Sequence, residues 1–222
     1  MEQFVTGAMN FKRKVFPKHR ELFEELLNGQ APEALCITCS DSRIDPNLVT
    51  QTRPGDLFII RNAGNIVPPH TRQAGGVTAS IEYAVAVLKV GHIVICGHTH
   101  CGAMHGVLDP DSVAALPHVR DWLEHCRAAS AIVKERHGEV GPEHFRELIE
   151  QNVLAQLRHL RTHPSVAAGL ATGRLQVHGW VYELDTGEVF CHDETTDTFR
   201  PVAERYRKLL AETAAAVAAV AE

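Results

Sequence analysis

Residues 34–43 read ALCITCSDSR, and residues 92–102 read HIVICGHTHCG. Each stretch begins with a short, almost wholly apolar run and ends in a turn that carries cysteine or histidine. Runs of this length and composition are typical of strands buried in a parallel sheet. Because open α/β folds build their sites at the carboxyl ends of such strands, we expect the two turns to lie close together.

A third apolar run covers Leu57–Ile60, and the segment Gly75–Leu88 that follows it is rich in alanine and glycine and nearly apolar all round. This composition predicts a strand and then a helix that is packed on two sides and ends at Gly91. The order strand, helix, strand is the pattern of a parallel α/β sheet.

A long helical pattern begins at Pro142, and a second helix-length segment ends near Gly173. Residues 175–182 then alternate as a strand, and a turn leads from them into residues 189–191, which predicts a hairpin. The expected fold class is therefore α/β: a mostly parallel central β-sheet flanked by helices, with an N-terminal helical arm and a C-terminal hairpin strand.

The length of 222 residues suits one substantial α/β domain. We therefore expect residues 1–222 to form a single domain. Apolar side chains at helical spacing, interrupted near Pro17, predict the helical arm over residues 1–28. The alanine-rich end of the chain predicts a helical tail over residues 203–222.

Charge and hydropathy exclude several partners. The net charge is −5, and lysine and arginine are scattered among acidic residues, so there is no basic stripe for a nucleic acid. No apolar run approaches the roughly 20 residues of a membrane span. The first residues lack the basic and then apolar order of a signal peptide, so a cytoplasmic location is expected.

Six cysteines without a signal peptide favour reduced thiols and metal ligation over a disulfide framework. Cys39 and Cys101 stand, together with His98, in the turns after the two strands. Two thiolates and one imidazole leave one of zinc's four positions open, whereas structural zinc usually has four protein ligands. The soft thiolates favour Zn²⁺. The sequence thus predicts a catalytic zinc site.

The spacing Cys36-x-x-Cys39 also allows a redox pair, but Cys36 follows alanine and leucine inside a strand and not at a helix N-terminus. Its odd offset from Cys39 turns it to the opposite face of that strand. Four cysteines are interpreted as small buried apolar residues: Cys36, Cys96, Cys126 and Cys191.

Alternation along an extended segment would place Asp41 and Arg43 on the same side as Cys39, just past the first strand. An acid and a cation would then stand beside the metal. They suit a reaction better than a purely structural site.

Four segments together resemble a β-class carbonic anhydrase, closely over residues 30–108: CSDSR at 39–43, RNAGN at 61–65, IEYA at 81–84 and GHTHCG at 97–102. Residues 154–166 and 177–182 also resemble the bacterial members, especially those associated with cyanate breakdown. The alanine-rich tail lies outside this resemblance.

The resemblance implies a zinc lyase that reversibly hydrates carbon dioxide to bicarbonate and a proton. It makes Cys39, His98 and Cys101 the zinc ligands and pairs Asp41 with Arg43. It also implies a homodimer or a higher homo-oligomer. Four further residues match substrate-binding positions, in a cleft that the family lines across a subunit interface: Gln30, Phe58, Tyr83 and Gly102.

Regulation is the point at which this chain departs from part of the family. In some members the residue equivalent to Asp41 caps the metal, and these members have a tryptophan where this chain has Cys36. Arg61 and Tyr182 match the rest of that bicarbonate site. Without the indole, we expect the open form, with zinc accessible, to predominate near neutral pH.

Two other functions use the same residues. The site could hydrolyse carbonyl sulfide or carbon disulfide, since family members with that activity differ in how the cleft is gated. Alternatively, a structural or metal-buffering protein would have Asp41 as a permanent fourth zinc ligand. Many histidines are available as proton shuttles, and His105 is nearest in sequence to the site, although a solvated helix position explains it better.

Overall fold

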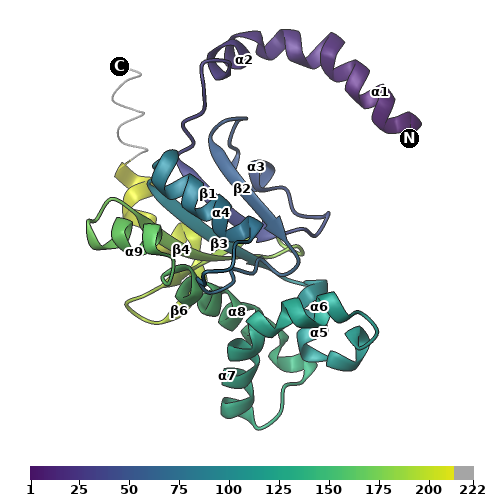
Figure 1. The fold of residues 1–222 in the computed structure, drawn as a ribbon, viewed down its shortest axis with the longest axis vertical. Helices are drawn as coiled ribbons and strands as arrows, with labels where there is room; N and C mark the ends of the chain where they lie inside the picture. Colours follow the sequence, from purple (N-terminus) through teal and green to yellow (C-terminus); the bar gives the residue numbers. More distant parts are fainter. Residues whose placement is uncertain (213–222) are drawn as a thin grey trace.

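The computed structural model describes residues 1–212 and has a six-stranded sheet at its centre (Figure 1). The strands are β1 (Ala34–Cys39), β2 (Leu57–Asn62), β3 (His92–His98), β4 (Gln176–Tyr182), β5 (Val189–Asp193) and β6 (Thr198–Pro201). Their order is β2-β1-β3-β4-β5-β6, in which the first four are mutually parallel and the last two antiparallel. The expected mostly parallel sheet and the β4–β5 hairpin are confirmed. The added edge strand β6 was not predicted.

Helices surround the sheet and extend from it (Figure 1). The helical segments before β3 are α1 (Glu2–Asn10), α2 (Arg20–Leu26), α3 (Pro46–Thr50) and α4 (Gly76–Glu82). After β3 come α5 (Gly102–Leu108), α6 (Pro117–Leu123), α7 (Arg127–His137), α8 (Phe145–Leu160), α9 (Pro164–Ala171) and α10 (Val202–Arg205). The helix predicted from Pro142 corresponds to a short 3₁₀ turn followed by α8. The part of the expected tail beyond residue 212 lies outside the described residues.

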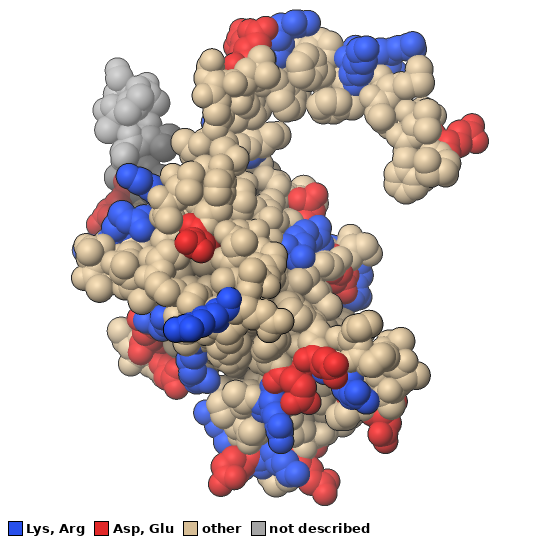
Figure 2. Space-filling view, viewed as in Figure 1, with Lys and Arg blue, Asp and Glu red and all other residues tan. Residues whose placement is uncertain are grey.

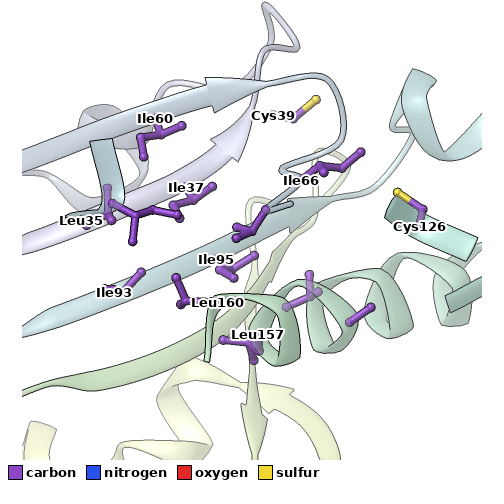
Figure 3. Close-up of a cluster of buried hydrophobic side chains, with 14 of the residues drawn as sticks. Leu35, Ile37, Cys39, Ile60, Ile66, Ile93, Ile95, Cys126, Leu157 and Leu160 are labelled. Atoms are coloured by element: carbon purple, nitrogen blue, oxygen red, sulfur yellow. The ribbon is translucent and has the colours of Figure 1, made fainter. Parts of the chain in front are cut away.

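The main core lies between one face of the sheet and the helices α4 and α8. Leu35 and Ile37 of β1 and Ile93 and Ile95 of β3 are each 0% exposed on this face (Figure 3). They alternate with residues of the other face because successive strand side chains point in opposite directions. Each such side chain contributes about 1.5–3 kcal/mol through burial. This core therefore fixes which strand residues face α8.

The other face of the sheet lines a cavity of about 700 Å³. Cys36 and Cys96 open onto this cavity, whereas Cys39 belongs to the core on the opposite face. Burial raises the pKa of the Cys36 thiol to about 12. All six cysteines are free and buried, as the sequence predicted for the four outside the metal site.

The segment Gly75–Leu88 differs from the expected continuous, doubly packed helix. After α4 it forms a π-helical turn, Tyr83–Val87. Ile81 packs in the core, but Tyr83 is 45% exposed and Val87 60% exposed. Only one side of this helix is therefore covered within one chain.

The N-terminal arm extends away from the sheet in Figure 1. It is interrupted by a 3₁₀ helix at Phe16–His19, as Pro17 predicted. Helix α1 buries none of its residues, and Phe4 is 74% exposed. Over the visible face of the body, charges of both signs are interspersed (Figure 2). Among residues 1–212, no helix combines the length and the apolar composition that a membrane crossing requires.

Side chains near the end of α8 hold the loop that follows β2. His159 Nδ1 donates to the carbonyl oxygen of Val67 at 3.0 Å, and His163 Nε2 donates to that of Pro68 at 3.0 Å. Burial lowers the pKa of both imidazoles below the ordinary value of 6.5. Both rings are therefore neutral in the folded state at neutral pH.

The two rings make stability depend on pH. The unfolded chain takes up protons on these histidines as the pH falls below 6.5, whereas the folded chain resists them, so folding loses free energy in that range. We expect the unfolding temperature to fall between about pH 7.5 and 5.5. His163→Gln keeps a donor for Pro68 and should flatten this dependence, whereas His118→Gln, at an exposed position, should not. Equal slopes in both variants, measured by calorimetry, would contradict the assignment.

Candidate metal centre

Three side chains from two neighbouring strand ends come together. Cys39 is the last residue of β1, His98 is the last residue of β3, and Cys101 is the N-cap residue of α5. Their ligand atoms all lie within 4.8 Å of one another, and the two sulfur atoms are 3.9 Å apart. No other group of three or more potential metal-binding side chains occurs among residues 1–212.

The hydrogen bonds of His98 leave one ring nitrogen without a partner. Nδ1 lies 2.8 Å from the carbonyl oxygen of Thr99, which can only accept, so Nδ1 carries the proton. Nε2 is buried without a hydrogen-bond partner in the described chain. An unpaired buried acceptor costs about 1–3 kcal/mol. A cation bound between this nitrogen and the two sulfurs removes that cost, so the donor set fits a soft divalent metal.

The two thiols share their protons unequally. A hydrogen bond from Cys101, together with the backbone amide of Gly64, holds the pKa of the Cys39 thiol well below its ordinary value. The same contact with Cys39, together with burial, raises the pKa of Cys101. A metal binds thiolates and not thiols, so both cysteines must give up their protons when a divalent cation binds.

Asp41 and Arg43 form a salt bridge beside this cluster, as expected, but by a different local geometry. β1 ends at Cys39, and residues 41–44 form a turn in which the amide of Ile44 donates to the carbonyl of Asp41. The strand alternation predicted for these residues is therefore wrong. The turn lets Arg43 bind both carboxylate oxygens, at 2.9 Å through Nε and 2.7 Å through Nη2.

These bonds keep Asp41 ionised. The hydrogen bonds and the charge of Arg43 hold the pKa of the Asp41 carboxyl well below its ordinary value. Its Oδ2 lies 4.0 Å from His98 Nε2, so the carboxylate stands next to the metal-binding atoms. The backbone amide of Arg43 also donates to Oδ1 at 3.0 Å.

The sequence did not predict that Arg61 and Arg43 donate hydrogen bonds to backbone carbonyls around the site. Arg61 donates from Nε to the carbonyl of Cys39 at 3.0 Å and from Nη2 to that of Asp41 at 2.7 Å, so it shapes the backbone of the turn. Arg43 also donates to the carbonyl of His100, whose ring binds Asp185 at 2.9 Å and not the cluster. The RNAGN segment signalled Arg61, but no local pattern indicated its two acceptors.

The predicted substrate-binding residues do not all meet within one chain. Gly102 adjoins the cluster directly after Cys101. Gln30 precedes the amino end of β1, whereas Cys39 ends that strand. Phe58 is aligned with Leu35, four residues before Cys39, which is about 13 Å along the strand. The ring centre of Tyr83 lies 6.1 Å from that of Phe58, so Tyr83 is placed beside Phe58 and not beside the cluster of its own chain.

The remaining residues singled out from the sequence lie on either side of the sheet. Tyr182 lines the cavity with Cys36, on the face opposite the main core. His105 is exposed on α5 and stacks on Phe145, with ring centres 4.2 Å apart.

Comparisons with known proteins agree with this arrangement. The sequence model of the carbonic anhydrase family matches residues 34–189. The chain belongs to this family. A carbonic anhydrase of Pseudomonas aeruginosa is 47% identical over 204 residues, which cover 92% of this chain and 93% of the relative.

Solved structures identify the class. The β-carbonic anhydrase CcaA is 43% identical, with a TM-score of 0.87 over 90% of this chain and 98% of that one. A tetrameric β-carbonic anhydrase from Sordaria macrospora is 32% identical, with a TM-score of 0.74 over 86% of this chain and 97% of that one. The protein is thus a β-class carbonic anhydrase of the bacterial type, as its motifs predicted.

Proposed function

We propose that this carbonic anhydrase hydrates carbon dioxide reversibly with Zn²⁺ held by Cys39, His98 and Cys101. The unpaired Nε2 of His98 beside two buried sulfurs supports this ligand set best. Zinc bound there supplies Lewis acidity that lowers the pKa of a water molecule toward neutrality. Three protein ligands leave a position for that water.

The Asp41 carboxylate orients the attacking water. As an ionised acceptor next to His98, it takes a hydrogen bond from the water and so directs the remaining lone pair toward the carbon of carbon dioxide. Arg43 binds both carboxylate oxygens and thereby opposes their movement onto the metal. This arrangement favours an open site over one in which Asp41 is a permanent fourth ligand.

The substrate pocket forms between copies of the chain. Gly102 contributes its backbone N–H to the pocket beside the cluster of its own chain. Gln30, Phe58 and Tyr83 line the pocket beside the cluster of a partner chain. The distance of about 13 Å between Phe58 and its own Cys39 supports this division. The related Sordaria macrospora enzyme is tetrameric, which supports a homo-oligomer with a dimer as its smallest unit.

A cytoplasmic location accords with the thiols. All six cysteines are free, and the two in the cluster must stay reduced to bind metal.

Assembly can be tested at the exposed face of the π-helical turn. Val87 is 60% exposed, and Val87→Glu would place a charge in an apolar interface, so it should shift sedimentation toward the monomer. Leu48→Glu, at a 68% exposed position on α3, is the matched control and should leave the sedimentation coefficient unchanged. A wild-type chain that sediments as a monomer would contradict the shared pocket.

Activity is tested by stopped-flow hydration of carbon dioxide between about pH 6.5 and 9, with zinc assayed in the same sample. An open site predicts a gentle rise with pH that follows one ionisation. A steep loss below about pH 8 would show that Asp41 caps the metal. One zinc per chain without hydration at any pH would refute the proposed reaction, and carbon disulfide turnover would then be measured.

The Asp41–Arg43 pair gives a separate prediction. Arg43→Ala should lower hydration by about 10-fold or more at neutral pH, because Asp41 loses the two side-chain donors that oppose its movement onto the metal, while zinc content stays at the wild-type level. Arg53→Ala removes an exposed arginine that pairs with Asp56 and serves as the control. Full activity in the Arg43 variant would exclude this role.

A further inference from the structure

One of the cluster's sulfurs accepts a hydrogen bond from the backbone of a distant loop. The amide nitrogen of Gly64 lies 3.4 Å from Cys39 Sγ. Gly64 has a φ of +82°, and a β-carbon at this position would lie 3.1 Å from Ala103 Cβ and 3.3 Å from Met104 Cε. Glycine therefore allows the peptide to approach the sulfur in a backbone conformation that other residues rarely adopt.

Two side chains from different helices hold the carbonyls on either side of this amide. Trp122 on α6 donates from Nε1 to the oxygen of Ala63 at 2.9 Å. Asn152 on α8, which is 1% exposed, donates from Nδ2 to the oxygen of Gly64 at 3.1 Å. The Ala63 carbonyl and the Gly64 N–H belong to one peptide group, so the indole and the sulfur bind its two ends.

An N–H that donates to a thiolate withdraws charge from the sulfur, and a metal bound to that sulfur then stays more strongly Lewis acidic. This effect matters in a site with two thiolates, which together donate more charge than imidazoles would.

We propose that Trp122 and Asn152 are positioning residues of the metal centre, which aim the Gly64 amide at Cys39 Sγ. This inference rests on the proposed zinc site. The two residues touch neither the cluster nor the substrate, and they act through the peptide between them. If they merely fastened the loop, their loss would lower stability and leave the sulfur's bond to the metal unchanged. His159 and His163 already fasten the loop further along, at Val67 and Pro68.

The chain offers a matched pair of tryptophans for the test. Trp122→Phe removes the N–H that binds Ala63 and keeps an aromatic ring against the core. Trp180→Phe makes the same chemical change where the buried Nε1 has no partner in the described chain. In cobalt-loaded protein, the sulfur-to-cobalt charge-transfer band should move to longer wavelength in the Trp122 variant only. Transfer of zinc to a chelator should become about 10-fold faster or more in that variant.

Asn152→Leu tests the second carbonyl, and Gln151→Leu is its control. Gln151 is the neighbouring residue on α8, 8% exposed, and it lines a different cavity with Arg136 and Glu147. The Asn152 variant should shift the band and speed zinc release in the same direction. If it does not fold, the tryptophan pair decides the matter alone.

The outcomes separate the two proposals. Folded Trp122 and Asn152 variants with the wild-type band and the wild-type release rate would overturn the positioning role and leave the zinc site standing. A wild-type protein that takes up neither zinc nor cobalt at one per chain would overturn the zinc site, and the positioning role with it.

Discussion

The parallel register of β1 against β3 is the constraint on which the metal centre depends. Thr38 is aligned with Cys96, so β1 and β3 end at the same edge and bring Cys39 next to His98. A slip of one residue would turn Cys39 to the cavity side and Leu35, which is 0% exposed, out of the core. Thr38 Oγ1 also donates to the carbonyl of Cys96 at 2.9 Å, which adds a bond specific to this alignment. The core that stabilises the sheet thus also sets the ligand geometry.

The fold leaves a buried acceptor at this edge whose cost a bound cation would relieve. His98 Nε2 has no partner in the described chain, and the sulfurs of Cys39 and Cys101 lie 3.9 Å apart in a buried setting. Natural sequences accept such local conflict mainly where function requires it. The surrounding bonds satisfy other atoms: the Thr99 carbonyl accepts a hydrogen bond from Nδ1, and Arg61 donates to the carbonyls of Cys39 and Asp41. Among the three ligand side chains, His98 Nε2 is thus left open beside the two sulfurs.

Short-range patterns in the sequence predicted strands β1 to β5 and the meeting of Cys39, His98 and Cys101. Apolar runs marked β1, β2 and β3, and the turns after β1 and β3 carried the ligands, so the rule that parallel strands end at one edge brought them together. Contacts between distant segments were not accessible in this way. The bond from Trp122 to Ala63 joins residues 59 positions apart. Trp122 itself lies in a helical region, residues 108–141, for which the sequence pattern gave no prediction. The β6 edge strand was missed because four residues are too few to show alternation.

In the proposed open site, the hold of Arg43 on Asp41 depends on the turn more than on burial. Arg43 is 52% exposed at its side chain, so water competes for its charge and a simple surface pair would be weak. Here, however, the turn presents three donors of one residue to one carboxylate, through the backbone amide, Nε and Nη2. Movement of Asp41 onto a metal would disturb these three hydrogen bonds. The free energy of the new metal–carboxylate bond would have to offset their loss. Arg61 holds the Asp41 carbonyl and Arg43 also binds the His100 carbonyl, and both bonds oppose movement of the turn with the side chain. The contacts that oppose capping in the proposed open site therefore belong to the turn, whereas Cys36 faces the cavity on the other side of β1.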